Sequence, residues 1–324
     1  MDALSDLLQV VKLNGALFLD SRFTAPWCVE SRPARESGGL FAGYEHIVFF
    51  HALTHGRCLV RLKGGGEAMQ VQAGDLLLLA HDDAHYLGSD LQLASVTSDS
   101  IVRPGPPGGL MSIDHGGGGE QTRFICGFLA CDPQLCRPLL DALPRMLRVP
   151  LNDGAGAPWL LDLLRHGAQA HSAPGPGSGT VMAKLAELLF VEAMRRHIAS
   201  LPQGEVGWLA GLRDRYVGRA LAAMHERPTQ AWTVDDLAAH SGLSRSALAQ
   251  RFNELIGQPP MQYLKRWRLR RAAAALKDSR RPVAALAEEY GYESESSFNR
   301  AFKREFGMPP AAWRRKGARF ASTA

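Results

Sequence analysis

Apolar residues in the last third of the chain follow a helical spacing that occurs twice. The first copy runs from Thr233 to Tyr263 and the second from Pro282 to Trp313. Each copy has an apolar helix pattern, a glycine, a second helix pattern and a Gly-x-Pro-Pro ending. Matched pairs are Val234 with Val283, Leu237 with Leu286, Ala238 with Ala287, Gly242 with Gly291, Phe252 with Phe302, Gly257 with Gly307 and Pro260 with Pro310. The repeat predicts two helix-turn-helix motifs, each with one DNA-reading helix.

The second helix of each copy is the expected reading helix. Ser244 is placed to cap a helix over 245–255, and the matching helix covers 294–306. Apolar spacing turns residues such as Leu248 and Phe298 inward, so polar side chains face outward. Gln can bind adenine and Arg can bind guanine through two hydrogen bonds each, which makes Arg300 the strongest candidate for base recognition. The expected DNA-facing residues are Arg245, Ser246, Ala249, Gln250, Asn253, Ser296, Ser297, Asn299, Arg300, Lys303 and Arg304.

One continuous helix over 261–278 should join the two copies. Prolines precede it, and the run 272–275 of four alanines favours it. At about 1.5 Å per residue it spans about 27 Å, which suits two reading helices in successive major grooves. Its basic residues are expected to add positive charge for phosphate contacts or to form a solvated surface; they are Lys265, Arg266, Arg268, Arg270 and Arg271.

The first hundred residues have a different pattern. Short apolar runs alternate with glycine and charged turns, which predicts an all-β barrel or sandwich. Expected strands cover 46–50, 57–62, 69–71, 75–79 and 122–129. The stretches 104–109 and 116–119 are rich in glycine or proline and are expected to be loops.

Helical spacing follows over 138–147, 159–170 and 180–199, with a loop at 173–179. The last of these helices has one apolar face, which suits packing on a domain or pairing with a second copy. We therefore expect three parts: a barrel with appended helices over 1–200, a linker over 201–211 and an all-α DNA-binding domain over 212–316.

Charge divides the chain in the same way. From Leu209 to Ala324 there are 21 Lys and Arg but 11 Asp and Glu, whereas the rest has 16 and 21. A basic domain joined to an acidic one is typical of a nucleic-acid-binding protein. The chain shows neither a membrane-spanning apolar run nor a signal peptide at 1–11, so a cytoplasmic protein without membrane association is expected.

The segments WTVDDLAAHSGLSRSALAQRFNELIGQPPMQYLKRWRLRRAAAAL and VAALAEEYGYESESSFNRAFKREFGMPPAAWRR resemble the DNA-binding domain of AraC/XylS transcription regulators. The resemblance covers about a third of the chain, from Arg213 to Arg315. It implies a second domain that senses an effector or dimerises. It also places base-contacting positions at Ser246, Gln250, Ser297 and Arg300, although Ser246 and Ala249 are smaller than in many relatives.

The stretch 74–89 resembles the second cupin motif, in which Gly74 and His85 keep their places while Ala80, Asp82 and Ser89 replace the usual residues. His51 falls where the first motif has a ligand. His51, His55 and His85 could meet inside a barrel and hold zinc or iron. Histidines that satisfy backbone groups or line an apolar pocket are the more frequent alternative.

The cysteines and the catalytic motifs bear on two further hypotheses, oxidant sensing and catalysis. Cys126 and Cys131 could form a thiol-based oxidant sensor, although Cys126 lies in an apolar run where a buried, inert thiol is expected. Motifs of serine hydrolases, zinc peptidases, P-loop enzymes and dinucleotide-binding enzymes are absent from the sequence, so catalysis has little support.

The sequence thus predicts a non-enzymatic, sequence-specific transcription regulator: a cupin-like β-barrel with appended helices, then an all-α double helix-turn-helix domain. Expected partners are double-stranded DNA, a second copy of the chain, RNA polymerase and a small-molecule effector; no cofactor is expected. The alternatives are an oxidant-sensing regulator and a metal-dependent barrel enzyme fused to a DNA-binding module.

Overall fold

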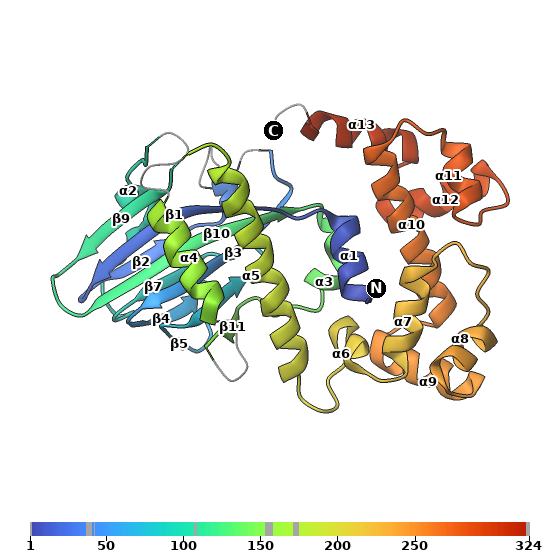
Figure 1. The fold of residues 1–324 in the computed structure, drawn as a ribbon, viewed down its shortest axis with the longest axis horizontal. Coiled ribbons are helices and arrows are strands. Elements are labelled where there is room, and N and C mark those ends of the chain that lie inside the picture. Colours follow the sequence, from blue (N-terminus) through green and yellow to red (C-terminus); the bar gives the residue numbers. More distant parts are fainter. Residues whose placement is uncertain are drawn as a thin grey trace. The chain divides into compact units, whose positions relative to one another are not determined.

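The computed structural model describes residues 2–36, 41, 43–106, 109–152, 158–170 and 175–321 (Figure 1). The chain forms two compact units. One, here called the sheet unit, contains Leu13–Cys131 and Leu143–His197. The other, the helical unit, contains Met1–Lys12, Asp132–Ala142 and Ile198–Ala324.

The sheet unit is built from two β-sheets. The six-stranded sheet has the order β11-β6-β3-β10-β1-β9, and the five-stranded sheet has the order β5-β4-β7-β2-β8. The strands are β1 (Asn14–Thr24), β2 (Cys28–Ser31), β3 (His46–His55), β4 (Arg57–Leu62), β5 (Met69–Gln72), β6 (Asp75–Leu79), β7 (His85–Gly88), β8 (Val96–Thr97), β9 (Met111–Gly116), β10 (Gln121–Cys131) and β11 (Leu147–Pro150).

The core of this unit lies between the two sheets. One cluster of buried side chains draws on both, for example Leu53 and Phe124 from the first sheet and Val60 from the second. Strand β10 runs antiparallel to β1 on one side and to β3 on the other, with Cys126 paired to His51. Two sheets around one core confirm the all-β barrel or sandwich that the sequence predicts.

Helices α4 (Pro158–Ala170) and α5 (Ser178–Ser200) pack on the six-stranded sheet, while η1 (Ala34–Glu36) and α2 (Ser98–Ile101) are short. Helix α4 contacts β3 and β10. Two glycines permit close packing: a Cβ at Gly167 of α4 would lie 2.7 Å from Met182 of α5, and a Cβ at Gly15 of β1 would lie 2.8 Å from Ala186.

The helical unit contains the remaining helices, several of which contact the long helix α10 (Figure 1). They are α1 (Ala3–Val11), α3 (Pro133–Leu140), α6 (Trp208–Arg213), α7 (Val217–Glu226), α8 (Val234–Ser241), α9 (Arg245–Ile256), α10 (Pro260–Asp278), α11 (Val283–Glu289), α12 (Glu295–Phe306) and α13 (Pro310–Ala321). Helix α5 ends at Ser200, and α6 begins within the expected linker.

The observed elements confirm most of the predicted ones. All five expected strands are present, and α4, α5 and α10 begin within two residues of their predicted starts. The helix expected over 138–147 is wrong in its bounds: α3 starts at Pro133, because Asp132 caps it, and β11 begins at Leu147. Pro282 is the N-cap of α11 instead of its first helical residue. Of the expected loops, 107–108 and 173–174 lie outside the described residues.

The two units do not divide the chain at residue 200 alone, as the sequence predicts. Helix α1 and helix α3 come from the first half of the sequence but belong to the helical unit. Helix α1 contacts α3, α7 and α10, and α3 also contacts α6 and α10. Leu4, Leu7, Val10 and Val11 are all buried there. Two short segments of the first half therefore complete the core of the helical unit.

Candidate DNA-binding surface and internal cavity

The first helix-turn-helix motif consists of α8 and α9. A capping box opens α8, since Thr233 Oγ1 accepts from the backbone N–H of Asp236 while the Asp236 carboxylate accepts from that of Thr233. Gly242 then turns the chain with φ +78°, a conformation that favours glycine. Ser244 caps α9 through the N–H of Ala247. Short-range contacts alone thus fix where the reading helix begins.

The outward face of α9 carries the residues predicted from the sequence. Leu248 and Phe252 are fully buried, whereas Arg245, Ser246, Gln250 and Asn253 are exposed and Ala249 is half-buried. Some of these side chains contact neighbours: the amide of Gln250 donates to Glu254 at 2.9 Å, and Arg245 pairs with Asp235 at 3.2 Å. Both contacts lie at the surface, where a nucleic acid can replace them at small cost.

The second reading helix, α12, repeats this geometry. Ser294 caps it through the N–H of Ser297, and Gly307 ends it with φ +75°. Phe298, Ala301, Phe302 and Phe306 form its buried face. Arg300 is exposed, and its Nη1 donates to Ser296 Oγ one turn earlier at 3.3 Å. The outward residues are Ser296, Arg300, Lys303 and Arg304, which are exposed, and Ser297 and Asn299, which are half-buried.

An arginine–carboxylate pair holds α9 in place. Arg251 donates from Nε to both oxygens of Asp214, which lies ahead of α7, and from Nη2 to Oδ2 at 2.5 Å. Burial would raise the pKa of Asp214, but hydrogen bonds from Arg251 and from the N–H groups of Val217 and Tyr216 outweigh it and lower that pKa. The carboxylate thus stays ionised and fixes the back of α9.

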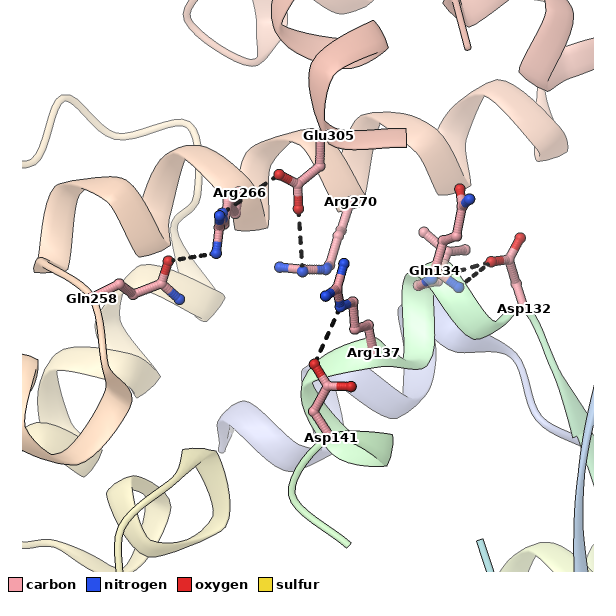
Figure 2. Close-up of polar contacts among 9 residues, drawn as sticks. Asp132, Gln134, Arg137, Asp141, Gln258, Arg266, Arg270 and Glu305 are labelled. Carbon is pink, nitrogen blue, oxygen red and sulfur yellow. Dashed lines mark hydrogen bonds and ion pairs between the residues drawn. The ribbon is translucent and has the colours of Figure 1, made fainter. Parts of the chain in front are cut away.

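A second pair holds α12 (Figure 2). Glu305 accepts from Arg270 Nη2 at 3.4 Å and pairs with Arg266 Nε at 3.5 Å, and Arg266 also donates to Gln258 at 3.0 Å. Arg270 is only 6% exposed. Burial is the main cause that lowers its pKa, and Glu305 opposes that effect. Such a buried pair fixes the angle between α10 and α12 because either partner alone would be costly to bury.

Most of the basic residues of α10 thus have structural roles that sequence reasoning missed. Arg268 donates to the carbonyl oxygens of Pro228 and Gln230, at 2.6 and 2.7 Å, and lies beside the turn at Gly291. The expectation that Arg266, Arg268 and Arg270 supply phosphate contacts does not fit these positions. Lys265 is exposed and remains a candidate for phosphate binding. Counting charges along the sequence could not distinguish the basic residues that hold the fold together from those that are exposed to bind phosphate.

Helices α1 and α3 are tied to the C-terminal end of α10. Lys277 of α10 forms an ion pair with Asp132, the N-cap residue of α3, and lies 4.7 Å from the ring centre of Trp313. Lys12, which ends α1, pairs with Asp278 at 2.6 Å. Figure 2 shows Arg137 of α3 turned toward Arg270, with Asp141 as the hydrogen-bonding partner of Arg137.

A cavity of about 580 Å³ lies inside the sheet unit. Its walls are mostly apolar and aromatic, whereas the inner polar groups are Ser21, His51 and Cys126, all buried. Ser31, Arg32, Ser98 and Asp99 also line it. The apolar lining comes from Phe18, Leu19, Phe23, Val29, Phe41, Phe49, Leu87, Val102, Met111, Ile113 and Phe124. The volume and the lining are typical of a small-molecule site.

Hydrogen bonding fixes the protonation of the inner histidines. A carbonyl can only accept, so His85 Nδ1–H donates to the carbonyl of Asp83 at 3.0 Å. His85 Nε2 must then accept from His51 Nε2–H at 3.0 Å, and His51 Nδ1 accepts from the Cys126 thiol at 2.9 Å. Burial lowers the pKa of His85 to about 4 and that of His51 well below its usual value. Both rings are neutral at physiological pH.

The predicted three-histidine metal site is not assembled. His51 and His85 meet, but His55 is exposed at the end of β3, past an irregularity in the β3–β10 register. Within the described residues, no group of three or more His, Cys, Asp or Glu side chains is placed to hold a metal ion. The two buried rings instead satisfy each other and a backbone carbonyl.

All five cysteines are buried and reduced. Burial raises the pKa of Cys126 to about 12, so its thiol stays protonated. Cys126 and Cys131 lie five residues apart on one strand, which separates them by about 16 Å and points them to opposite faces. A direct disulfide would need Cα atoms within about 7 Å, so the structure does not bring this pair together.

Comparison with known proteins covers both parts of the chain. A family profile described as cupin matches residues 2–199, and one described as a helix-turn-helix domain matches residues 237–316. An AraC-like transcription regulator of Streptomyces lividans is 32% identical, and the match covers 97% of this chain and 98% of the Streptomyces regulator. The regulator AlkR of Acinetobacter baylyi is 28% identical over 98% of this chain and 100% of its own.

Among solved structures, the DNA-binding domain of AdpA in complex with a target DNA is 28% identical and covers 34% of this chain and 96% of its own, with a TM-score of 0.31. Within the described residues, none of the helices is long and apolar enough to cross a membrane. The full-length match to the Streptomyces regulator, together with the paired helix-turn-helix motifs and the cupin sheets, shows that this chain belongs to the AraC-like family of DNA-binding transcription regulators.

Proposed function

We propose that α9 and α12 read the sequence of an operator in two successive major grooves. The observation that carries this proposal is that each helix presents a polar face outward while an arginine–carboxylate pair holds its back. Helix α10 has 19 residues and spans about 28 Å at ~1.5 Å per residue, which suits neighbouring grooves on one side of B-form DNA.

Within this proposal, base recognition depends most on Arg300 and Gln250. Arg300 can offer two parallel N–H groups to guanine, and Gln250 can pair with adenine in the same way. Arg245, Ser246, Ala249 and Asn253 surround Gln250, while Ser296, Ser297, Asn299, Lys303 and Arg304 surround Arg300. Exposed cations such as Lys265 contact phosphates and supply affinity without sequence preference.

We propose further that the cavity of the sheet unit binds a small-molecule effector and that the chain acts as a homodimer. Four of the large exposed apolar side chains support the dimer: Trp159 and Leu163 lie on α4, and Val181 and Leu188 lie on α5. Trp159 is 54% exposed and Val181 is 53% exposed. Pairing through this face would let four reading helices bind a repeated operator, from which the protein would contact RNA polymerase.

Selection of bound fragments from genomic DNA tests the function and supplies the operator. With that operator, Arg300→Ala should weaken binding by about 1–3 kcal/mol and relax the preference at one base position. Lys265→Ala is the matched control: it should weaken binding to all sequences alike and reduce the salt dependence. Equal, sequence-independent losses for both variants would contradict the assignment of base and phosphate contacts.

An oxidant-sensing role is less supported than a ligand-sensing role. The thiol of Cys126 is protonated and hydrogen-bonded to His51, and it faces away from Cys131. Changing both cysteines to serine should therefore leave the response of a target promoter to oxidants unchanged. A lost response would favour the thiol-based alternative.

A further inference from the structure

We infer that the cavity binds an uncharged, mainly apolar molecule with a single polar group, and that this group meets Ser21 at the inner end. The inference rests on the proposed effector-sensing role of the cavity and specifies the class of effector. Five phenylalanines line the walls, so the body of the ligand has to be apolar or aromatic.

The inner end of the cavity selects against charge. His51 is neutral, since its Nε2–H donates to His85 and its Nδ1 accepts from Cys126. The thiol of Cys126 is also neutral. A carboxylate or an ammonium group placed there would lose its hydration without gaining an opposite charge, which is costly. The inner groups therefore suit a neutral hydroxyl or carbonyl.

Ser21 is the side chain best placed to bind that group. Its hydroxyl is buried and donates to the carbonyl of Phe124 over a long distance of 3.4 Å, and the side chain also forms a hydrogen bond with Cys126. Both bonds are weak, because one is long and the other involves sulfur. A ligand oxygen inside the cavity could take this donor and offer a shorter bond. The thiol hydrogen of Cys126 is already committed to His51, which leaves its sulfur as a weak acceptor.

Three probes with one ring system, together with a sugar, separate the possible ligand classes. Calorimetric titration of the full chain at pH 7 would use 2-naphthol, naphthalene, 2-naphthoate and D-xylose. We expect one 2-naphthol per chain, at least about tenfold weaker binding of 2-naphthoate and no binding of the sugar. Tighter binding of 2-naphthoate would overturn the inference, because it would place an anion beside Arg32. Failure of every naphthyl probe to bind would also overturn it.

Variants locate the bound probe. Ser21→Ala should weaken 2-naphthol binding about 2- to 12-fold and leave naphthalene binding unchanged, because only the hydroxyl loses a hydrogen bond. Ser112→Ala, an exposed serine on neighbouring β9, is the matched control and should change neither. Ile113→Trp should abolish binding by filling the cavity, and unchanged binding would place the probe elsewhere. Operator selection is independent of these titrations, so a wrong ligand class would leave the regulator function standing.

Two strands that line the cavity are joined directly to helices of the helical unit. Strands β1 and β10 line the cavity through Ser21 and Cys126, and they pair with each other to the end of β10, where Asn14 lies opposite Ala130. Residue 13 alone separates β1 from the αL residue Lys12 that ends α1, and Asp132 alone separates β10 from α3. Both strands therefore lead directly into helices of the helical unit.

We infer that α1 and α3 transmit cavity occupancy to α10. A ligand that shifts β1 relative to β10 would displace both helices, since each is joined directly to one of these strands. The ion pairs Lys12–Asp278 and Asp132–Lys277 would then displace α10, which joins the two reading motifs. Packed interfaces favour discrete arrangements, so a small shift at the strands can favour a different position of α10.

Hydrogen exchange of the full chain tests this route. Adding 2-naphthol should change the exchange rate about twofold or more in peptides from α1, α3 and α10. Ile113→Trp, whose indole fills the cavity in the absence of any probe, should have the same effect. Lys277→Met should reduce the response in α10 and leave the response of the cavity strands intact. A response confined to the strands in both the 2-naphthol and the Ile113→Trp experiments would overturn the inference.

Discussion

Replacing Leu7 with alanine should destabilise the helical unit and leave the sheet unit unchanged. Leu7 lies on α1, near the start of the chain, yet it is 1% exposed in a helix that contacts α3, α7 and α10. Truncating a buried leucine to alanine costs about 2–5 kcal/mol, because the transfer free energy is lost and a cavity remains. Each 1.4 kcal/mol is a factor of ten in the opening equilibrium.

Hydrogen exchange read by peptide is the suitable assay, since a two-unit protein does not unfold in one step. Peptides from α7 and α10 should exchange roughly 30-fold to several thousand-fold faster in Leu7→Ala. Leu53→Ala is the matched control: Leu53 is 0% exposed in β3, and its truncation should accelerate exchange in β3 and β10 instead. If Leu7→Ala accelerated the strands and spared α10, the assignment of α1 to the helical unit would be wrong.

Three further variants test the local chemistry. His225 is buried, which lowers its pKa to about 3, against about 6.5 in the unfolded chain. Below pH 6.5 the unfolded chain therefore binds a proton that the folded protein does not bind. As a result, the free energy of unfolding falls by about 1.4 kcal/mol per pH unit below pH 6.5. His225→Gln should therefore flatten the fall of the Tm of the helical unit between pH 6 and pH 4, and an unchanged slope would refute this. Asp214→Ala should lower the unfolding free energy by about 1–2 kcal/mol in denaturant titrations and weaken operator binding, because it frees α9 and uncaps α7; full stability and affinity would show the pair to be dispensable. Leu188→Arg should convert dimers to monomers in sedimentation analysis, and an unchanged mass would exclude the α4–α5 face.

The DNA-binding helices could be predicted from sequence because their determinants are local. Thr233 and Ser244 cap the helices that follow them, Gly242 has the positive φ that the turn requires, and apolar spacing sets the buried face. The second copy repeats these features, so each supports the other. The same reasoning correctly placed Arg300 on the exposed face of α12.

Contacts between distant residues could not be predicted in the same way. The sequence gives no sign that Glu305 pairs with Arg270, because the pairing depends on how α12 crosses α10. For the same reason, the meeting of His51 with Cys126 follows from the β3–β10 register and not from spacing along the chain. His55 lies apart from His51 and His85 because an irregularity in that register ends the alternation before it.

Helix α1 shows what the local sequence can predict and what only tertiary contacts determine. Asp2 caps this helix, and Leu4, Leu7 and Val11 recur at helical spacing, a local signal that could have predicted the helix although none was predicted there. They do not indicate which unit buries the apolar face, since the covalent connection to β1 favours the sheet unit equally well. Only the contacts with α7 and α10 decide the question. Helix α3, which follows β10, shares this position, so the helical unit contains the segment that precedes β1 and the segment that follows β10. The stability of the helical unit therefore depends on two segments joined directly to strands that border the cavity.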